Sequence, residues 1–423
     1  MSEIDGWNTK RFDEFGDLFS GATPSTSDSS YWDGDIVWIT PADLSGLSSR
    51  HIRSSAKKIT LKGLDACSTH LMPVGSVVMS SRAPIGYVAL PTVPFCTNQG
   101  CKTIRLREGY DPDFTYFNIL FNVKKIQDLG EGTTFAEVSK TALAGVELEF
   151  PTCTDEQAKI ADVLSTVDHF IESSEVLISK QQRIKLGLMQ ELLTFGVDKH
   201  GRVRSEKTHK FKNSLAGRMP EEWKIASVGE LFESRRERGR RGLPVMSIVM
   251  NDGLVERSSV ERRVTSNLPP EAHALVVKGD IAYNMMRMWQ GVLGRAEMDC
   301  LVSPAYVVLK PKDTINSHFA EWLFRDERSV LKFRRSSRGV VDDRLRLYAQ
   351  DLFSIEFAIP KSLDEQQAIA DRLEAIRAEI SKETALLKKM RRLRTGLMQD
   401  LLTGQKRVTP LLGANRRSAM QGS

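Results

Sequence analysis

The sequence contains one long segment twice. PTCTDEQAKIADVL, which begins at Pro151, returns as PKSLDEQQAIADRL, which begins at Pro360, an offset of 209 residues. The same offset pairs KLGLMQELLT, from Lys185, with RTGLMQDLLT, from Arg394, without a gap. About 19 of the 45 aligned positions are identical. A tandem duplication of this kind predicts two similar halves related by an approximate two-fold axis.

Both copies have the pattern of one long helix. Between Asp155 and Thr194 there is no proline and one glycine, and apolar residues recur every three or four positions. This spacing predicts a helix of roughly 40 residues, or about 60 Å. Thr154 is expected to cap the first helix, with Asp155 and Glu156 in its first turn, because acids are favourable at a helix N-terminus.

The apolar residues of the second copy alternate at intervals of three and four, which favours a paired coiled-coil seam. Polar Glu383 interrupts this pattern where Ser174 interrupts the first. We expect the two helices to pack on each other in antiparallel orientation; the alternative is that each packs on its own domain alone. The predicted seam and partner-contact residues are Ile160, Leu164, Val167, Ile171, Leu188, Met189, Leu192, Ile369, Leu373, Ile376, Ile380, Leu397, Met398 and Leu401.

The rest of each half reads as β-rich, because short apolar runs are separated by Gly, Pro, Ser and Asn. The best helical stretch of the first half is Asp113 to Leu129. The fold class predicted is α+β, with two β-rich domains joined by two long antiparallel helices and a pseudo-two-fold internal repeat. The expected divisions are a first domain at 1–152, a helix at 153–197, a linker at 198–222, a second domain at 223–361, a helix at 362–404 and a disordered tail at 405–423.

The duplication extends weakly into the β-rich domains. Residues 73–86 parallel residues 277–291, with Gly75 matching Gly279 and Arg82 matching Arg287. Each segment predicts a strand between a glycine turn and an exposed loop that carries arginine. Elsewhere the two domains diverge. Two divergent recognition domains would read an asymmetric, two-part nucleic-acid sequence, whereas two identical ones would read a palindrome.

Charge and composition bound the class of protein. The formal net charge is +6 and the isoelectric point is about 9.0. The excess lies in the second half: residues 212–359 hold 24 basic and 20 acidic residues, whereas residues 10–150 hold 14 and 16. This permits nucleic-acid binding.

Five scattered cysteines without a CxxC pair disfavour disulfides and zinc, and they fit a cytoplasmic location. No apolar stretch is long enough for a membrane span.

Loop residues of both domains are candidates for DNA contacts. Arg pairs with guanine and Asn or Gln with adenine, while Ser and Thr reach phosphates or base edges. The run SRRERGRRG, from Ser234, is a candidate strip of phosphate contacts, or else a solvated loop. The predicted DNA-binding residues are Ser81, Arg82, Asn98, Gln99, Thr133, Thr134, Arg235, Arg236, Asn284, Arg287, Trp289, Gln290, Ser336 and Arg338.

Catalytic motifs do not occur in the sequence. It has no GxxxxGK[ST], HExxH or GxSxG motif and no CxxC pair. NLPPE, from Asn267, departs from the catalytic tetrad of adenine methyltransferases, because Leu268 intrudes and Glu271 replaces the aromatic residue. The seven histidines are dispersed. We therefore expect no catalysis, no metal and no cofactor bound by this chain.

Taken together, the chain resembles the specificity subunit of type I restriction–modification enzymes. The resemblance covers almost the whole length, and its most specific marks are the two P-x3-DEQ-x2-IAD segments and the two GLMQ(E/D)LLT segments. It implies two target-recognition domains that read a bipartite DNA site, held apart by the two helices as a ruler. It also implies two S-adenosylmethionine-dependent adenine-N6 methyltransferase subunits, and two ATP- and Mg²⁺-dependent restriction subunits, as partners.

Two questions stay open at this level. Leu188, Met189 and Leu192, with Leu397, Met398 and Leu401, are either core residues or docking positions for the methyltransferase. The chain is also compatible with a methylation-only system that lacks a nuclease. A rival from another class is a coiled-coil adaptor that joins two β-rich domains and binds no DNA.

Overall fold

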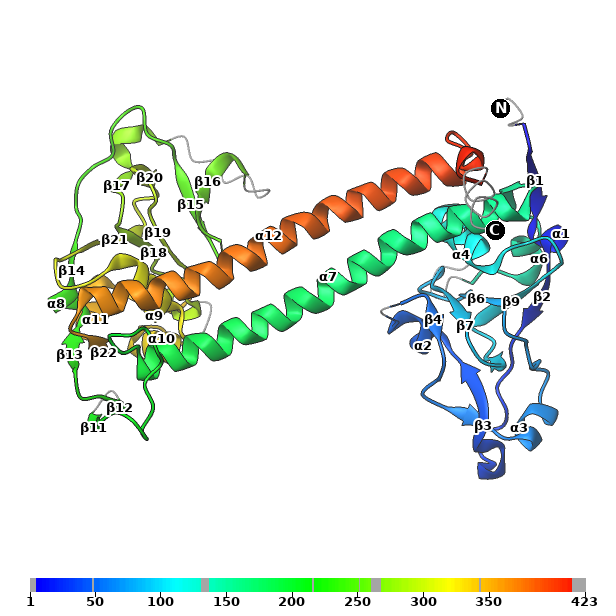
Figure 1. Ribbon diagram of the computed structural model, residues 1–423, viewed down its shortest axis with the longest axis horizontal. Coiled ribbons are helices and arrows are strands. Elements are labelled where there is room, and N and C mark those ends of the chain that lie inside the picture. Colours follow the sequence, from blue (N-terminus) through cyan, green and yellow to red (C-terminus); the bar gives the residue numbers. More distant parts are fainter. Residues whose placement is uncertain are drawn as a thin grey trace, which may run out of the picture. The chain divides into compact units, whose positions relative to one another are not determined.

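The computed structural model describes residues 5–47, 49–130, 137–214, 217–250, 252–259, 268–341 and 344–412. The chain divides into two compact units. Unit 1 comprises Met1–Leu177 and Glu383–Ser423, and unit 2 comprises Ile178–Lys382. The long helices α7 (Thr154–Phe195) and α12 (Leu363–Leu402) both cross the division. Each unit therefore contains the beginning of one long helix and the end of the other (Figure 1).

Unit 1 is built from short strands and short helices around its share of the long helices. Its strands are β1 (Trp7–Arg11), β2 (Gly16–Ser20), β3 (Trp32–Ile39), β4 (His51–Ile52), β5 (Lys58–Ile59), β6 (Val77–Ser80), β7 (Val88–Pro91), β8 (Phe95–Thr97), β9 (Cys101–Leu106) and β10 (Glu147–Pro151). Its short helices are α1 (Phe12–Phe15), η1 (Ser29–Tyr31), α2 (Pro41–Ser45), α3 (Leu61–Asp65), α4 (Pro112–Phe121), α5 (Val123–Gln127) and α6 (Lys140–Ala144).

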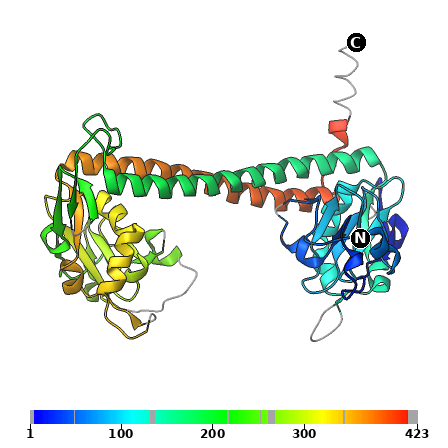
Figure 2. The ribbon, with the colours of Figure 1, turned by 90° about the horizontal axis from the view of Figure 1, so that it is seen from below.

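Unit 2 has the same kind of construction. Its strands are β11 (Phe211–Ser214), β12 (Gly217–Pro220), β13 (Trp223–Ser227), β14 (Phe232–Ser234), β15 (Met246–Val249), β16 (Gly253–Glu256), β17 (Ala274–Val276), β18 (Ile281–Asn284), β19 (Leu293–Arg295), β20 (Cys300–Val302), β21 (Tyr306–Pro311) and β22 (Glu356–Pro360). Its short helices are α8 (Val228–Leu231), η2 (Arg257–Ser259), η3 (Pro270–Ala272), η4 (Met288–Gln290), α9 (Ser317–Arg325), α10 (Glu327–Ser336) and α11 (Ala349–Phe353). In each unit most of the strands lie to one side of the long helices (Figure 2).

The principal sheet is the part of the fold that repeats. Its strand order is β2-β9-β6-β7-β4 in unit 1 and β14-β21-β18-β19 in unit 2. A two-stranded antiparallel pair precedes each long helix, and it places Trp7 opposite Pro151 and Trp223 opposite Pro360. The secondary sheets differ: unit 1 has the three strands β5-β3-β8, whereas unit 2 has the separate pairs β15-β16 and β17-β20. The divergence predicted from the sequence therefore lies outside the shared sheet.

The glutamine of each DEQ motif fastens a long helix to its β-rich domain. Buried Gln157 donates to the carbonyls of Pro151, at 2.9 Å, and Gly109, at 3.1 Å, and it accepts from the amide of Asp111 at 2.9 Å. Its counterpart Gln366 repeats this pattern. It donates to the carbonyls of Pro360, at 2.9 Å, and Thr314, at 3.4 Å, and it accepts from the amide of Asn316 at 2.7 Å. A buried side-chain amide needs partners for both its N–H and its C=O group, and these bonds supply them. The glutamine of the DEQ motif therefore has a structural role.

The two long helices pack together in antiparallel orientation, and each unit shows this with its own contacts. In unit 1, Ser174 donates to Glu383 at 2.9 Å, and Asp168 pairs with Arg394 at 2.5 Å. Residue numbers thus fall along α7 as they rise along α12. The Ser174–Glu383 bond joins the two polar residues that interrupt the seam, which fixes the helix register in unit 1 because a displaced register would bury them unpaired.

The predicted seam residues near the helix ends belong to the cores of the units. Ile160 and Leu164 of α7 pack with Met398 and Leu401 of α12 in the main core of unit 1. Met189 and Leu192 pack in the same way with Ile369 and Leu373 in unit 2. Leu188 and Leu397 pack against these cores and are partly buried. Ile171 is buried, and Val167, Ile376 and Ile380 are half-buried. Met189, Leu192, Met398 and Leu401 therefore pack in the cores of the units, which is one of the two roles that the sequence left open.

Several local expectations differ from the structure. Thr154 is the first residue of α7 and not its cap, and its hydroxyl donates to the carbonyl of Gly109 at 3.4 Å. The helix expected from Asp113 to Leu129 is divided into α4 and α5 at Asn122. The predicted linker at 198–222 contains the hairpin β11-β12, whose Phe211 packs on Phe195 at the end of α7.

The predicted disordered tail is in part ordered. After α12, Arg407 returns to the start of α7 and binds both carboxylate oxygens of Glu156, at 2.6 and 2.7 Å. Val408 is buried in the same core. Unit 2 has an equivalent arrangement, because Arg204, after α7, binds both oxygens of Glu365 at the start of α12. Residues 413–423 of the predicted tail lie outside the described residues.

Replacing Arg407 by alanine is expected to destabilise unit 1. The Glu156 side chain is 1% exposed, so the substitution leaves a buried carboxylate without its partner, and breaking a buried pair in this way costs about 3 kcal/mol. Lys406→Ala is the matched control, because Lys406 is exposed and pairs with Asp400 at the surface. Thermal unfolding monitored by circular dichroism measures both variants. Equal melting temperatures for the two would contradict the assignment of Arg407 to the core of unit 1.

Candidate nucleic-acid interface

Three connections meet at one edge of the principal sheet in unit 1. They are β6–β7 (residues 81–87), β8–β9 (98–100) and α5–α6 (128–139), and together they are termed loop edge 1. The amide of Ser81 donates to the carbonyl of Gly100 at 2.8 Å, and the amide of Val138 donates to the carbonyl of Ser81 at 2.8 Å. One backbone position therefore joins all three connections.

The corresponding connections of unit 2 are β18–β19 (285–292), β20–β21 (303–305) and α10–α11 (337–348), termed loop edge 2. The amide of Leu347 donates to the carbonyl of Met285 at 2.9 Å, as Val138 does to Ser81. The 3-10 helix η4 lies against α10, and the Arg334 guanidinium lies 5.7 Å from the centre of the Trp289 ring. The β18–β19 connection and the end of α10 thus form one surface.

The middle connection of each loop edge has the same turn. In unit 1 the side-chain oxygen of Asn98 accepts from the amide of Gly100 at 3.0 Å. In unit 2 the hydroxyl of Ser303 accepts from the amide of Ala305 at 3.3 Å. The side-chain carbonyl of Asn98 therefore shapes a turn, as Asn does commonly, and its amide nitrogen is the part left to read a base.

The predicted DNA-binding residues of unit 1 differ in exposure. Ser81 is buried, so its side chain offers no surface to DNA, contrary to the prediction. Arg82 is exposed and pairs with Glu137 at 2.8 Å. Gln99 is exposed and accepts from the Thr23 hydroxyl at 2.5 Å. Thr133 and Thr134 lie outside the described residues.

In unit 2 the predicted arginine strip is mostly engaged in ion pairs. The Arg235 side chain is 9% exposed and binds buried Asp280 through Nε at 2.5 Å and Nη2 at 3.2 Å, so it holds the fold together and is not placed to contact phosphate. The hydrogen bond with Asp280 raises the pKa of Arg235. Arg240 and Arg241 pair with Asp299 and Glu271. Arg236 is exposed, but it follows β14 and is not part of loop edge 2.

The remaining predicted residues of unit 2 lie on or beside loop edge 2. Arg287 and Gln290 are exposed, and Trp289 is half-buried with its indole nitrogen donating to the carbonyl of Met286 at 3.0 Å. The side-chain oxygen of Asn284 accepts from the amide of Met286, also at 3.0 Å. Two further predicted residues, Ser336 at the end of α10 and exposed Arg338, follow in the next connection.

The residues that give the two loop edges their charge were not among those predicted from the sequence. Glu137 binds Arg82 and Lys102 in unit 1. In unit 2, exposed Arg344 and Arg346 lie in the α10–α11 connection, after Arg334 and Arg335 at the end of α10. The repeat itself could have indicated Glu137 and Arg346. The offset of 209 residues also holds for the segment before Pro151, where it pairs α6 with α11 and Glu137 with Arg346.

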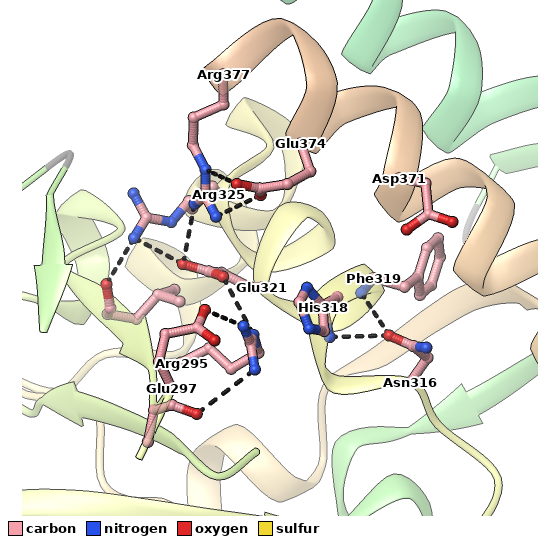
Figure 3. Close-up of polar contacts among 12 residues, drawn as sticks. Arg295, Glu297, Asn316, His318, Phe319, Glu321, Arg325, Asp371, Glu374 and Arg377 are labelled. Carbon is pink, nitrogen blue, oxygen red and sulfur yellow. Dashed lines mark hydrogen bonds and ion pairs between the residues drawn. The ribbon is translucent and has the colours of Figure 1, made fainter. Parts of the chain in front are cut away.

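A second charged cluster lies beside α12 in unit 2 (Figure 3). Buried Glu321 on α9 lies 3.0 Å from Arg325 Nη2 and 3.6 Å from Arg377 Nη1, and its other oxygen lies 3.8 Å from Arg295 Nε. Arg377 also pairs with Glu374 one turn earlier on α12. The carboxylate is surrounded by cations from β19, α9 and α12, so the cluster ties these elements together.

Among the residues that the structure describes, no group of three or more His, Cys, Asp or Glu side chains is arranged to hold a metal ion. Of the helices described there, none combines the length and apolar character needed to cross a membrane.

Comparisons with known sequences agree on one family. The model of the type I restriction modification DNA specificity domain matches residues 4–181. The MjaIX specificity subunit of Methanocaldococcus jannaschii is 33% identical over 231 residues, which is 54% of this chain and 52% of that protein. The chain thus spans about half the length of this relative. The MjaVIII specificity subunit of the same organism is 22% identical over 426 residues, which is 96% of this chain and 94% of that protein.

Solved structures share the fold. The S subunit of a type I restriction–modification system from M. genitalium matches with a TM-score of 0.60 at 17% identity, covering 95% of this chain and 97% of that one. A chain from a type I R-M system studied for complex assembly and conformational transition matches with a TM-score of 0.52 at 15% identity. At these identities the likeness shows the fold alone.

The charged cluster beside α12 generates a prediction about Lys185. The offset of 209 relates the Asp168–Arg394 pair of unit 1 to Arg377 and Lys185 in unit 2, so that both equivalent positions are cations there. Burial lowers the pKa of Lys185 from 10.5, and Arg325 and Arg377 lower it further. Lys185→Met is therefore expected to raise the melting temperature, by about 2–4 °C for each kcal/mol of penalty removed.

The gain in melting temperature of Lys185→Met is expected to depend on pH. A lysine with a lowered pKa in the folded state opposes folding while it is protonated, and this penalty disappears as pH rises through the lowered pKa towards 10.5. The difference in melting temperature between Lys185→Met and the parent should therefore shrink as pH rises. Lys180→Met, at an exposed position on α7, is the control. A gain that does not change with pH would contradict the charge argument.

Proposed function

Because the chain belongs to the specificity-subunit family of type I restriction–modification systems, we propose that it reads a bipartite, asymmetric DNA sequence through its two loop edges. Loop edge 1 and loop edge 2 each read one half of the site. Reading is sequence-specific where exposed Arg, Asn and Gln side chains reach base edges, and the remaining contacts go to phosphates.

The observation that carries this proposal is a shared sheet with divergent loops. Four strands of the principal sheet have the same order in both units, and an equivalent backbone bond joins two connections of each loop edge. The side chains differ: loop edge 1 presents Arg82 and Gln99, whereas loop edge 2 presents Arg287, Gln290 and Arg338. Two readers on one scaffold with different side chains suit two different half-sites.

The chain supplies recognition and not chemistry. Its buried carboxylates at Glu156, Glu321 and Glu365 are engaged by arginines, and each lies where it holds elements together. Methylation of adenine N6 is therefore assigned to two modification subunits that use S-adenosylmethionine. Cleavage is assigned to two restriction subunits that use ATP and Mg²⁺. A methylation-only system, without restriction subunits, is the alternative.

The long helices are the proposed docking surface for the modification subunits. Leu177 and Ile184 on α7 are exposed, and the offset of 209 places exposed Leu386 and Leu393 at the equivalent positions of α12. A contiguous apolar patch on a surface marks a contact with another protein, whereas single exposed apolar residues are common. The repetition of these positions on both helices fits two copies of one partner. A coiled-coil adaptor that binds no DNA would also use such a surface, but it gives no reason for divergent loop edges.

We also propose that α7 and α12 act as the ruler between the half-sites. Each is a continuous helix that passes from one unit into the other, and each is fastened at its start by a buried glutamine. A helix of 42 residues has a length of about 60 Å. The number of base pairs between the half-sites is then set mechanically by helix length.

The experiment that tests the function is co-expression with the modification subunit in a host free of DNA methylation. Single-molecule sequencing of the genomic DNA should reveal one new bipartite, asymmetric motif, with one N6-methyladenine in each half on opposite strands. A stable complex that produces a palindromic or undivided motif would contradict two divergent readers. Failure to form any complex would favour the adaptor.

The ruler is tested by an insertion of four helix-forming residues near Leu193 of α7. One extra helical turn lengthens the helix by about 6 Å and so changes the unread spacer by about two base pairs, while both half-sites keep their sequence. The measurement is the methylated motif of the insertion variant. A substitution of Glu191, which is exposed on the same turn, serves as the control. An unchanged spacer would contradict the ruler.

A further inference from the structure

The two loop edges carry opposite charge at equivalent positions. The connections α5–α6 and α10–α11 have the same length, 12 residues each. Residues 128–139 contain Asp128, Glu131 and Glu137 and no basic residue, whereas residues 337–348 contain three arginines and two aspartates. At the end of each connection the offset of 209 pairs Glu137 with Arg346, so a carboxylate in one unit is replaced by a guanidinium in the other.

In loop edge 1, Glu137 neutralises the neighbouring cations. Its carboxylate binds Arg82 Nε at 2.8 Å and lies 3.5 Å from Lys102 Nζ. The Lys102 side chain is 5% exposed, so it presents almost no surface. Arg82 is half-exposed, but a carboxylate already holds its guanidinium. Little positive charge is left on this edge to attract phosphates.

In loop edge 2, arginines from three segments meet. Arg338 and Arg346 are joined by two backbone hydrogen bonds of 2.9 Å, and the amide next to Arg346 binds the β18–β19 connection, which carries Arg287. Arg335 lies in the last turn of α10, beside loop edge 2 and three residues before Arg338. All four side chains are exposed. Among the described residues of this edge, Arg338 pairs with Asp351 at 2.5 Å, and the hydrogen bond with Asp351 raises the pKa of Arg338.

From this asymmetry we propose that loop edge 2 is the electrostatic anchor of the protein on double-stranded DNA. Arg346, with Arg287 and Arg335, contacts phosphates and supplies most of the salt-dependent affinity, whereas loop edge 1 contributes sequence reading with little salt dependence. The proposal rests on the proposed function and deepens it, since it assigns unequal roles to the two readers. DNA is the occupant because a dense row of phosphates is what several guanidiniums on one edge complement best.

The consequence is measurable in the salt dependence of binding. Each phosphate contact contributes roughly 0.9 to the slope of log K against log salt concentration. Arg346→Glu is therefore expected to reduce this slope by about 1 and to weaken binding about ten-fold or more on target and non-target DNA alike. Glu137→Gln removes the carboxylate that holds Arg82 and is expected to increase the slope by up to about 1.

The experiment uses the full chain in its complex with the modification subunit and measures fluorescence anisotropy with duplex DNA across a range of salt concentrations. Arg218→Glu is the charge-matched control, because Arg218 is exposed on β12 and pairs with Glu206. The control should keep the slope and affinity of the parent. A loss with Arg218→Glu equal to that of Arg346→Glu would show an effect of net charge and would overturn the anchor.

The sequence of the methylated motif distinguishes a phosphate contact of Arg346 from a base contact. If Arg346 contacts phosphates, the motif produced by Arg346→Glu stays the same as that of the parent; a motif relaxed in one half would make Arg346 a base reader and overturn the proposal. Unchanged DNA affinity with a weakened complex would mean that the edge binds an acidic protein, which also overturns it. Failure of the parent complex to bind DNA at all would instead refute the proposed function.

Discussion

One buried glutamine at the start of each long helix ties that helix to its β-rich domain through hydrogen bonds. Gln157 and Gln366 each join the helix, the strand before it and the loop ahead of a short helix. The adjacent glutamate, Glu156 or Glu365, binds an arginine that arrives after the other long helix. Each unit is therefore closed by the end of a helix that starts in the other half of the sequence. This gives a structural reason for the DEQ residues being identical in both copies of the duplication.

A scaffold fixed in this way leaves the loops free to diverge. The carbonyl that receives the bond from Val138 or Leu347 belongs to the backbone, so it holds the loop edge together whatever the side chains are. Glu137 and Arg346 occupy the same place in their units and have opposite charge, yet both connections keep their length. Recognition can thus change by substitution on the loop edges without disturbing the principal sheet or the helix pair.

The sequence predicted those features that depend on regular spacing, and it missed those that depend on distant partners. Apolar periodicity and the offset of 209 placed the long helices at 153–197 and 362–404, and the structure has them at Thr154–Phe195 and Leu363–Leu402. Arg235 was predicted to meet phosphate, but Asp280, 45 residues away, binds it in the interior. Ser81 was predicted to face DNA, but the bonds of its backbone to Gly100 and Val138 leave its side chain inside. Such pairings arise from tertiary contacts and leave no local pattern.

The most direct measurement of two-reader recognition is site-specific photo-crosslinking from the two loop edges. A photoreactive residue is placed at Gln99 in one variant and at Gln290 in another, both exposed positions, and each complex with the modification subunit is irradiated on DNA that carries the methylated motif. Two divergent readers predict that Gln99 crosslinks to one half of the motif and Gln290 to the other, with the spacer unlabelled. Crosslinks from both positions to the same half, or to the spacer alone, would contradict it.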